Sequence, residues 1–220
     1  MEKHLAILHT TAATIGGMKA LCAELLPGMA VYHYLHDGLL PRINREGSIS
    51  DAVREEFSSL VALAAKSDPA AILSACSTVG ELLEGLREEY DIPLLRVDDP
   101  MARQAAAVQG SVTVCATLPS TLGPTLRLIQ RYRQSGGSVK ACVLEEAGRL
   151  LNEGKREEYL RQIAKALEAL AQSSDAVVLA QASMADALSL IPEPLHPKFL
   201  TSPRSGISAL KIYCEQEEKE

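Results

Sequence analysis

The chain has 220 residues, of which 47% are hydrophobic and 23% are charged. This length can bury a sizeable core, in one domain or in two small lobes, and this balance is typical of a soluble globular protein rather than a disordered one. The net charge of -6 argues against a nucleic-acid partner, because binding to a phosphate backbone needs a concentrated basic surface.

The sequence gives no sign of membrane insertion or export. No stretch approaches the apolar length of a membrane span, and the first residues lead straight into a short strand pattern, unlike a signal peptide. We therefore expect a cytoplasmic protein with no membrane partner.

Short apolar runs alternate with longer amphipathic segments along the whole chain. The runs that we interpret as strands cover residues 4–8, 30–34, 71–74, 94–97, 111–115, 139–144, 176–180 and 199–201. The segments with helical periodicity cover residues 15–26, 50–67, 79–90, 122–135, 157–173 and 184–190. This alternation predicts an α/β protein with parallel sheets covered by helices.

The order of motifs repeats within the chain. Residues 5–16 resemble residues 112–123, with Thr10 facing Thr117 at an offset of 117 − 10 = 107, and Cys76 corresponds to Gln181 at an offset of 181 − 76 = 105. Two motif pairs at nearly the same offset predict duplicated lobes related by a pseudo-twofold axis. We expect residues 1–100 with 201–220 in the first lobe and residues 101–200 in the second.

The predicted strands end in turns that carry small polar residues. In α/β lobes, ligands bind outside the carboxyl ends of the strands, where backbone amides and helix N-termini converge. If the lobes face each other, the two threonine-rich turns and the Cys76 and Gln181 turns line one cleft. Hydroxyl and main-chain N–H donors suit a small carboxylate, and no G-x-G-x-x-G or Walker-type sequence indicates a nucleotide.

The five cysteines, an odd number without a C-x-x-C pair, indicate neither a disulfide framework nor a zinc cluster. Cys22, Cys115 and Cys142 lie in apolar helix or strand patterns, where inert buried thiols are the default. Cys76 differs because it follows a strand at a strand-to-turn junction. On position alone, it is either a small core residue or a functional thiol.

Six segments in this order and spacing carry a family resemblance: 9–11 (His9-Thr10-Thr11), 75–80, 98–101, 116–122, 180–186 and 200–206. On them, the chain resembles the aspartate/glutamate/hydantoin racemase superfamily over nearly its whole length. The resemblance implies two α/β lobes with a cleft between them, often in a homodimer or higher oligomer, and catalysis without a cofactor or metal.

The resemblance also implies a two-thiol mechanism, with one cysteine from each lobe on opposite faces of the substrate's acidic carbon. One group removes a proton while the other returns one to the planar intermediate. Nearby hydroxyls and amides bind the carboxylate and stabilise the developing enolate-like charge. The first cysteine maps onto Cys76, and the residues expected to bind substrate are Thr10, Thr11, Ser77, Thr78, Thr117, Ser120, Thr121, Gln181, Ala182 and Ser183. The threonines and Ser120 have a second interpretation as helix caps.

Gln181 departs from the family pattern, because an amide neither releases nor accepts a proton usefully near neutral pH. A single thiol still permits a decarboxylase, in which loss of carbon dioxide generates the carbanion that Cys76 protonates. A cis-trans isomerase or another lyase with Cys76 as nucleophile is also open. So is a carboxylate-binding protein without activity, whereas a Cys-dependent hydrolase is disfavoured because no histidine has an evident orienting partner.

Few residues are candidates for a second acid or base. His9 begins the first threonine turn and is either catalytic or a hydrogen-bonded structural residue. Glu145 and Glu146 end a predicted strand and either enter the cleft or face solvent, and Asp186 is more simply an acid favoured near a helix N-terminus. The sequence leaves Arg204 open between the cleft and the surface.

Overall fold

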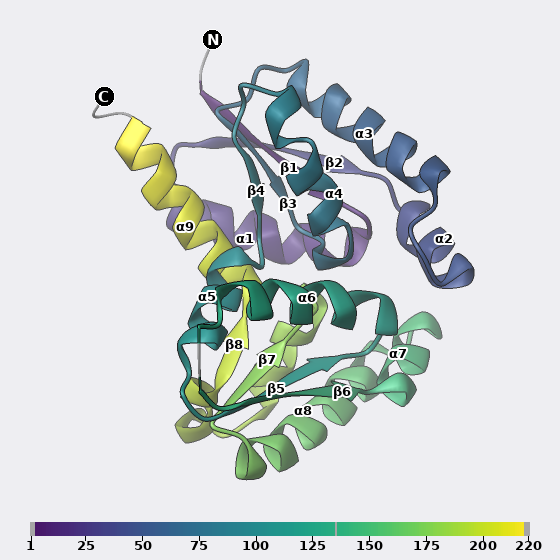
Figure 1. Cartoon of the computed structure of the whole chain (residues 1–220), viewed down its shortest axis with the longest axis vertical. Coiled ribbons are helices and arrows are strands. Elements are labelled where there is room, and N and C mark those ends of the chain that lie inside the picture. The colour runs from purple at the N-terminus through teal and green to yellow at the C-terminus, as the bar shows by residue number, and fades with distance from the viewer. Residues whose placement is uncertain (1–2, 135, 218–220) are drawn as a thin grey trace. The chain divides into compact units, whose positions relative to one another are not determined.

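The computed structural model describes residues 3–134 and 136–217, and the chain divides into two compact units. The first unit comprises Met1–Asp99 and Pro203–Glu220, and the second comprises Pro100–Ser202. Each unit contains a four-stranded parallel sheet flanked by helices (Figure 1). This architecture confirms the predicted α/β class with a parallel sheet in each lobe.

The sheet of the first unit consists of β1 (His4–His9), β2 (Ala30–Leu35), β3 (Ala71–Ser74) and β4 (Leu94–Arg96) in the order β2-β1-β3-β4. All neighbouring strands run parallel. The central strands β1 and β3 are buried along their whole length. Their continuous apolar character follows from this, because helices cover both faces of a parallel sheet.

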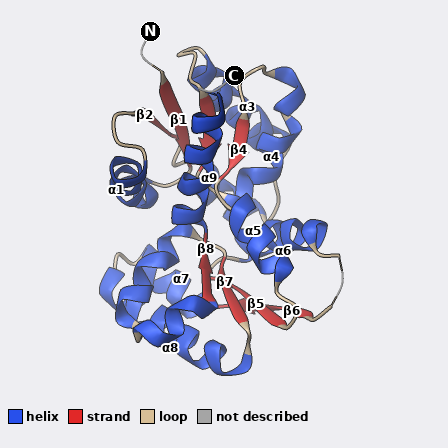
Figure 2. Cartoon of the chain, turned by 90° about the vertical axis from the view of Figure 1, so that its left-hand side faces the viewer, coloured by secondary structure: helices blue, strands red, loops and turns tan. Residues whose placement is uncertain are grey.

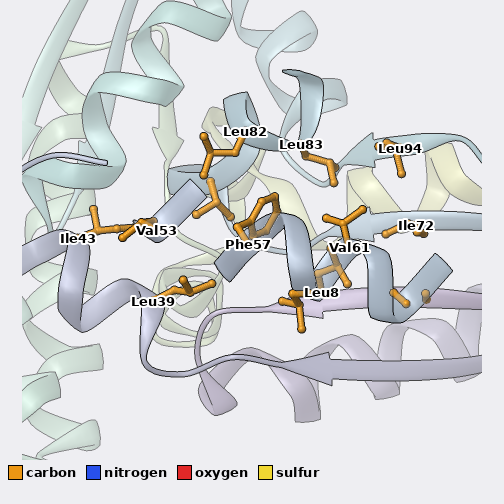
Figure 3. Close-up of a cluster of buried hydrophobic side chains, with 14 residues drawn as sticks. Leu8, Leu39, Ile43, Val53, Phe57, Val61, Ile72, Leu82, Leu83 and Leu94 are labelled. Carbon is orange, nitrogen blue, oxygen red and sulfur yellow. The ribbon is translucent and has the colours of Figure 1, made fainter. Parts of the chain in front are cut away.

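Alternate side chains of these strands pack against different helices. Ala6 and Leu8 face a cluster built around Phe57 of α3 (Asp51–Ala65), with further side chains from α2 (Leu39–Glu46) and α4 (Gly80–Gly85) (Figure 3). Leu5 and Ile7 face the opposite cluster, which contains α1 (Ile15–Leu25) and the C-terminal helix α9 (Ser202–Glu217). The last helix of the chain therefore completes the core of the first unit.

The second unit repeats this sheet with β5 (Ser111–Ala116), β6 (Ser138–Val143), β7 (Ala176–Leu179) and β8 (Phe199–Thr201). Across this sheet the strand order is β6-β5-β7-β8 (Figure 2). In both units, therefore, the second strand in chain order lies at one edge of the sheet, followed by the first, the third and the fourth. One face packs on α5 (Asp99–Ala107) and α6 (Pro119–Tyr132), and the other packs on α7 (Glu145–Asn152) and α8 (Arg156–Ser173).

All eight predicted strands are present, with ends that differ by a residue in several cases. The predicted helix over residues 79–90 is shorter: α4 ends at Gly85, and a 3-10 turn follows at Arg87–Glu89. The segment predicted over residues 184–190 is a 3-10 helix, Ala182–Leu190. The helices α2, α5, α7 and α9 were not among those predicted. Among the described residues, no helix is long and apolar enough to cross a membrane.

Candidate functional site

Two turns leave the same edge of the first sheet. β1 and β3 are neighbours, with Leu8 and Ser74 as register partners, and the amide of Ala75 donates to the carbonyl of Leu8 at 2.9 Å. The segment that begins at His9 and the segment that contains Cys76 therefore follow adjacent strands at their carboxyl ends. The structure brings the predicted site residues of the first unit to one sheet edge.

Cys76 lies between β3 and a 3-10 turn, Ser77–Val79, that leads into α4. The Ser74 hydroxyl accepts from the Cys76 amide at 3.4 Å and donates to the Cys76 carbonyl at 3.3 Å, so it fixes the backbone at the thiol. Ser77 and Thr78 are buried, whereas Cys76 is half-buried. Cys76 is thus the more exposed residue of an otherwise enclosed turn, and it packs against the hydrophobic cluster that contains Phe57.

The hydroxyls of Thr10 and Thr11 have different environments. Thr11 Oγ1 accepts from the amide of Ala13 at 3.3 Å and caps the 3-10 turn Ala12–Thr14, as the capping interpretation expects. Thr10 is only 3% exposed, and its Oγ1 has no hydrogen-bond partner among the described residues. A buried hydroxyl without a partner is unfavourable. Among the described residues, the hydrogen-bonding capacity of the Thr10 hydroxyl is therefore unused.

His9 is fully buried, and both its ring nitrogens have partners. Thr14 Oγ1 donates to the carbonyl of Thr11 at 3.2 Å, so it accepts from His9 Nδ1 at 2.8 Å. His9 Nε2 then accepts from His33 Nδ1 at 2.9 Å. Burial, together with the charge of His33, lowers the pKa of His9 to about 4. These contacts match the structural interpretation of His9, and its catalytic role stays a prediction.

In the second unit, Thr117 and Gln181 follow the neighbouring strands β5 and β7. The amide of Ala180 donates to the carbonyl of Cys115 at 2.9 Å, as Ala75 does to Leu8 in the first unit. Gln181 has φ −119° and ψ 131°, close to the φ −124° and ψ 117° of Cys76. Gln181 therefore occupies the backbone position that Cys76 occupies in the first unit.

The side-chain amide of Gln181 has a fixed orientation. Its Oε1 accepts from the Thr117 backbone amide at 2.5 Å and from Thr117 Oγ1 at 2.8 Å. Because a backbone N–H can only donate, the carbonyl end of the side chain must face Thr117. The Nε2 group, with two N–H donors that no described residue accepts, is directed away from Thr117.

Two residues that the sequence did not single out support this turn. Tyr159 of α8 is fully buried, and its hydroxyl lies 3.2 Å from Ser183 Oγ. Gly148 of α7 packs so closely that a Cβ there would lie 2.6 Å from the Thr117 carbonyl oxygen. In the sequence, Tyr159 stands in the mixed-charge run 154–161, whose pattern is typical of a solvated helix face, and the burial of Tyr159 contradicts that interpretation at this residue. Gly148 lies in a helix that the sequence does not predict.

The remaining predicted binding residues lie on the same two turns. Thr121 is buried, and Ser120, Ala182 and Ser183 are half-buried. The N-cap residue of α6 is Leu118, which makes no side-chain capping bond. The capping interpretation of Thr117, Ser120 and Thr121 is therefore wrong for this helix.

The other candidate charged groups face solvent. Glu145 and Glu146 are exposed in the first turn of α7, Asp186 forms an ion pair with Arg156, and Arg204 forms one with Glu24 at 2.7 Å. Each of these two pairs lies on the surface of its own unit.

Cys22 and Cys115 differ from Cys76 because both are buried. Burial raises the pKa of Cys22 to about 11, and burial together with the neighbouring Cys142 raises the pKa of Cys115. A thiol whose thiolate is suppressed in this way is inert, as expected for core cysteines. In the described part of the chain, no group of three or more His, Cys, Asp or Glu side chains is arranged to hold a metal ion.

Comparison with known proteins gives a consistent family. The fold is similar to that of glutamate racemase from Thermus thermophilus, at 19% identity and a TM-score of 0.70, covering 99% of this chain and 82% of that chain. Allantoin racemase from Klebsiella pneumoniae matches at 15% identity and a TM-score of 0.67, covering 98% and 89%. An unliganded arylmalonate decarboxylase matches at 14% identity and a TM-score of 0.56, covering 93% and 89%.

A search among curated proteins found no match. The family model of the Asp/Glu/hydantoin racemases matches residues 6–208, nearly the whole chain. The repeated sheets, the turns at their carboxyl edges and this match agree, and the chain belongs to the Asp/Glu/hydantoin racemase family.

Proposed function

We propose that this protein is a cofactor-independent enzyme that acts on a small carboxylate by proton transfer at the acidic carbon, with Cys76 as its single catalytic thiol. The observation that carries the proposal is the pair of equivalent turns. One presents a half-buried thiol, and the other presents an amide whose carbonyl is already bound by Thr117. That both turns bind the same substrate molecule is part of the proposal.

The chemistry of the first turn suits proton transfer beside a carboxylate. The Cys76 thiol gives or takes a proton at the substrate carbon. The Thr10 hydroxyl, which has no partner among the residues that the structure describes, donates to a carboxylate oxygen of the substrate.

The chemistry of the second turn suits charge stabilisation. The two N–H donors of Gln181 Nε2 bind a carboxylate or the enolate oxygen that develops as the carbanion forms. Because Thr117 holds the amide before substrate arrives, these donors need little reorganisation during the reaction. An amide takes no part in proton transfer, so this turn leaves one face of the substrate without an acid or base.

A reaction that needs one proton donor is therefore favoured over racemisation by two thiols. In a decarboxylation, the bond to the leaving carboxylate supplies the electron pair, carbon dioxide departs, and Cys76 protonates the resulting carbanion on one face. The similarity to an arylmalonate decarboxylase shows that this fold is found in a decarboxylase. The alternatives are proton exchange on one face of an amino acid, cis-trans isomerisation and lyase chemistry at Cys76. The experiment described next distinguishes them.

The experiment is to incubate the protein in deuterium oxide with amino acids, hydantoins, malonates and maleate, and to follow deuterium entry, product and chirality. We expect deuterium to enter one face of the substrate carbon, with or without formation of a new product. We expect the Cys76→Ser variant to lose this activity while it keeps its fold. Cys142→Ser is the matched control, because Cys142 is also half-buried but lies on β6. Full turnover by the Cys76→Ser variant would refute the proposal.

The competing function is a binding protein that has lost its chemistry. Tight binding of a carboxylate by the wild-type protein, with neither deuterium entry nor product across the panel, would favour that function over an enzyme. Sedimentation of the same preparation tests the homodimer, which remains an expectation from the resemblance.

A further inference from the structure

A buried ionic cluster lies next to the Cys76 turn in the first unit. Arg96 at the end of β4 makes a bidentate pair with Asp98, with Nε–Oδ1 at 2.9 Å and Nη2–Oδ2 at 2.8 Å. Its Nη1 lies 3.1 Å from Oε2 of Glu84 on α4. The side chains of Arg96 and Asp98 are each 1% exposed, and that of Glu84 is 13% exposed. Burying three charges is costly, and an apolar pair at such a site is often at least as stable.

Arg96 contacts the chain on both sides of the Cys76 turn. On the strand side, Arg96 is the register partner of Ser74, whose hydroxyl binds the amide and carbonyl of Cys76. On the helix side, the guanidinium packs on Gly80, where a Cβ would lie 2.4 Å from Arg96 Nε. One turn further along the helix, Glu84 binds the same guanidinium. The segment 75–79 therefore lies between a residue that pairs with the Arg96 backbone and a helix that contacts the Arg96 side chain.

The charge of Arg96 is permanent. Burial by itself lowers the pKa of Arg96, but Asp98 and Glu84 outweigh this effect and hold that pKa above its usual range. The cluster therefore contains one fixed cation and two carboxylates. Since it is screened from water, charges in it act more strongly on nearby groups than surface charges do.

We propose that Arg96 is a positioning residue that holds the Cys76 turn between β3 and α4 and, balanced by Asp98 and Glu84, sets the reactivity of the Cys76 thiol. The inference deepens the proposed function, because its importance depends on Cys76 being the reacting group. Its test needs no substrate, so the two can fail separately.

The test is the rate at which Cys76 is alkylated by iodoacetamide in the folded protein at neutral pH. Trypsin places Cys76 in the peptide of residues 67–87 and Cys142 in the peptide of residues 141–149, and each peptide contains no other cysteine. Mass spectrometry then measures both thiols in one sample. Cys142, which lies in the second unit, is the internal reference.

Two variants shift the charge of the cluster in opposite directions. Arg96→Met leaves two carboxylates without their cation, which disfavours the thiolate, so we expect Cys76 to be alkylated at least fivefold more slowly. Glu84→Gln removes one carboxylate but keeps an oxygen that accepts from Arg96, so we expect Cys76 to react at least twofold faster. Glu88→Gln makes the same charge change at an exposed position and should leave the rate unchanged.

Opposite changes in the alkylation rate distinguish an effect of the cluster's charge from a purely structural role. Simple loosening of the turn would change the rate in the same direction in both variants. The inference is overturned if both rates move in the same direction, or if both stay within a factor of 1.5 of wild type while the Cys142 rate is constant. If Arg96→Met fails to fold, the Glu84→Gln variant alone decides the test. Glutamine is nearly isosteric with glutamate, and Glu84 is the least buried of the three charged residues in the cluster. A Glu84→Gln rate equal to or below that of wild type then overturns the inference.

Discussion

The amide of Gln181 and the thiol of Cys76 stand at equivalent residues of two equivalent turns, but their neighbours differ. Thr117 gives both its backbone N–H and its hydroxyl to Gln181, whereas the corresponding hydroxyl of Thr10 has no partner among the described residues. The difference follows from side-chain chemistry, because an amide oxygen is a strong acceptor and a thiol a weak one. In the second turn the threonine and the amide are therefore bonded to each other, whereas in the first turn the threonine hydroxyl makes no such bond in the described structure.

Replacing Gln181 with cysteine tests the restriction to one thiol. If the proposed mechanism holds, Gln181→Cys gives the second turn a group that can exchange a proton, and deuterium should enter on both faces of the substrate with loss of optical purity. Chiral chromatography of the products in deuterium oxide measures this change. Gln181→Asn is the control, since it also shortens the side chain but adds no thiol. Deuterium entry on only one face of the substrate in both variants would contradict the two-turn mechanism.

The pair of buried His9 and half-buried His33 makes stability depend on pH. Because the pKa of His9 is about 4 in the folded protein, the unfolded chain takes up a proton near pH 6.5 while the native protein does not. The free energy of unfolding should therefore fall by roughly 2 to 3 kcal/mol between pH 6.5 and pH 4 through this residue. Urea unfolding at a series of pH values should show a smaller loss for His9→Gln. His196→Gln, in the second unit, should keep the wild-type dependence.

At the scale of elements, helix length and the distance from the preceding strand separate the predicted helices from the others, and α9, which was not predicted, follows β8 directly. Helices α1, α3, α6 and α8 have 11 to 18 residues and show clear periodicity. The eight-residue helices α2 and α7 are too short for a reliable period, and α5 follows β4 after only two residues. In the 3-10 helix Ala182–Leu190, Met184 and Ala187 pack in one cluster with residues of α8 and the second sheet, contacts that a local pattern does not contain.

The packing of α7 against the Thr117 turn gives a prediction for Gly148. A methyl group there meets a backbone oxygen, which cannot rotate away, so Gly148→Ala should lower the free energy of unfolding by roughly 1–3 kcal/mol. Gly17→Ala in α1 is the matched control, because no atom lies within 4 Å of its added Cβ and the helix should gain up to about 1 kcal/mol. Thermal unfolding of both variants measures the contrast. Equal changes in the two would show that α7 does not press on Thr117.

At the scale of the whole molecule, the chain has separate cores on both faces of two sheets. Phe57, fully buried, lies in a cluster made only of residues from the first unit (Figure 3). Phe57→Ala should therefore cost about 3–5 kcal/mol of unfolding free energy. Amide hydrogen exchange should speed up first in β1, β3 and α3. Equal loss of protection throughout β5–β8 would mean that the two cores unfold as one unit.

The sequence by itself determined the class of the fold, the eight strands and the position of the turns that carry the candidate site residues. It did so because buried parallel strands are continuous apolar runs and because a duplicated chain repeats its motifs at a constant offset. The equivalence of Cys76 and Gln181 was visible in this way before any coordinates.

Only the tertiary structure decided which polar groups on those turns already have partners. It placed Arg96, Asp98 and Glu84 together beside Cys76, and it oriented the amide of Gln181 through Thr117. It also joined His9 to His33 across neighbouring strands. Apart from the Arg96–Asp98 pair, these contacts connect residues that are 12 or more positions apart in the chain. A hydrogen bond depends on distance and angle in space, which local sequence patterns do not encode.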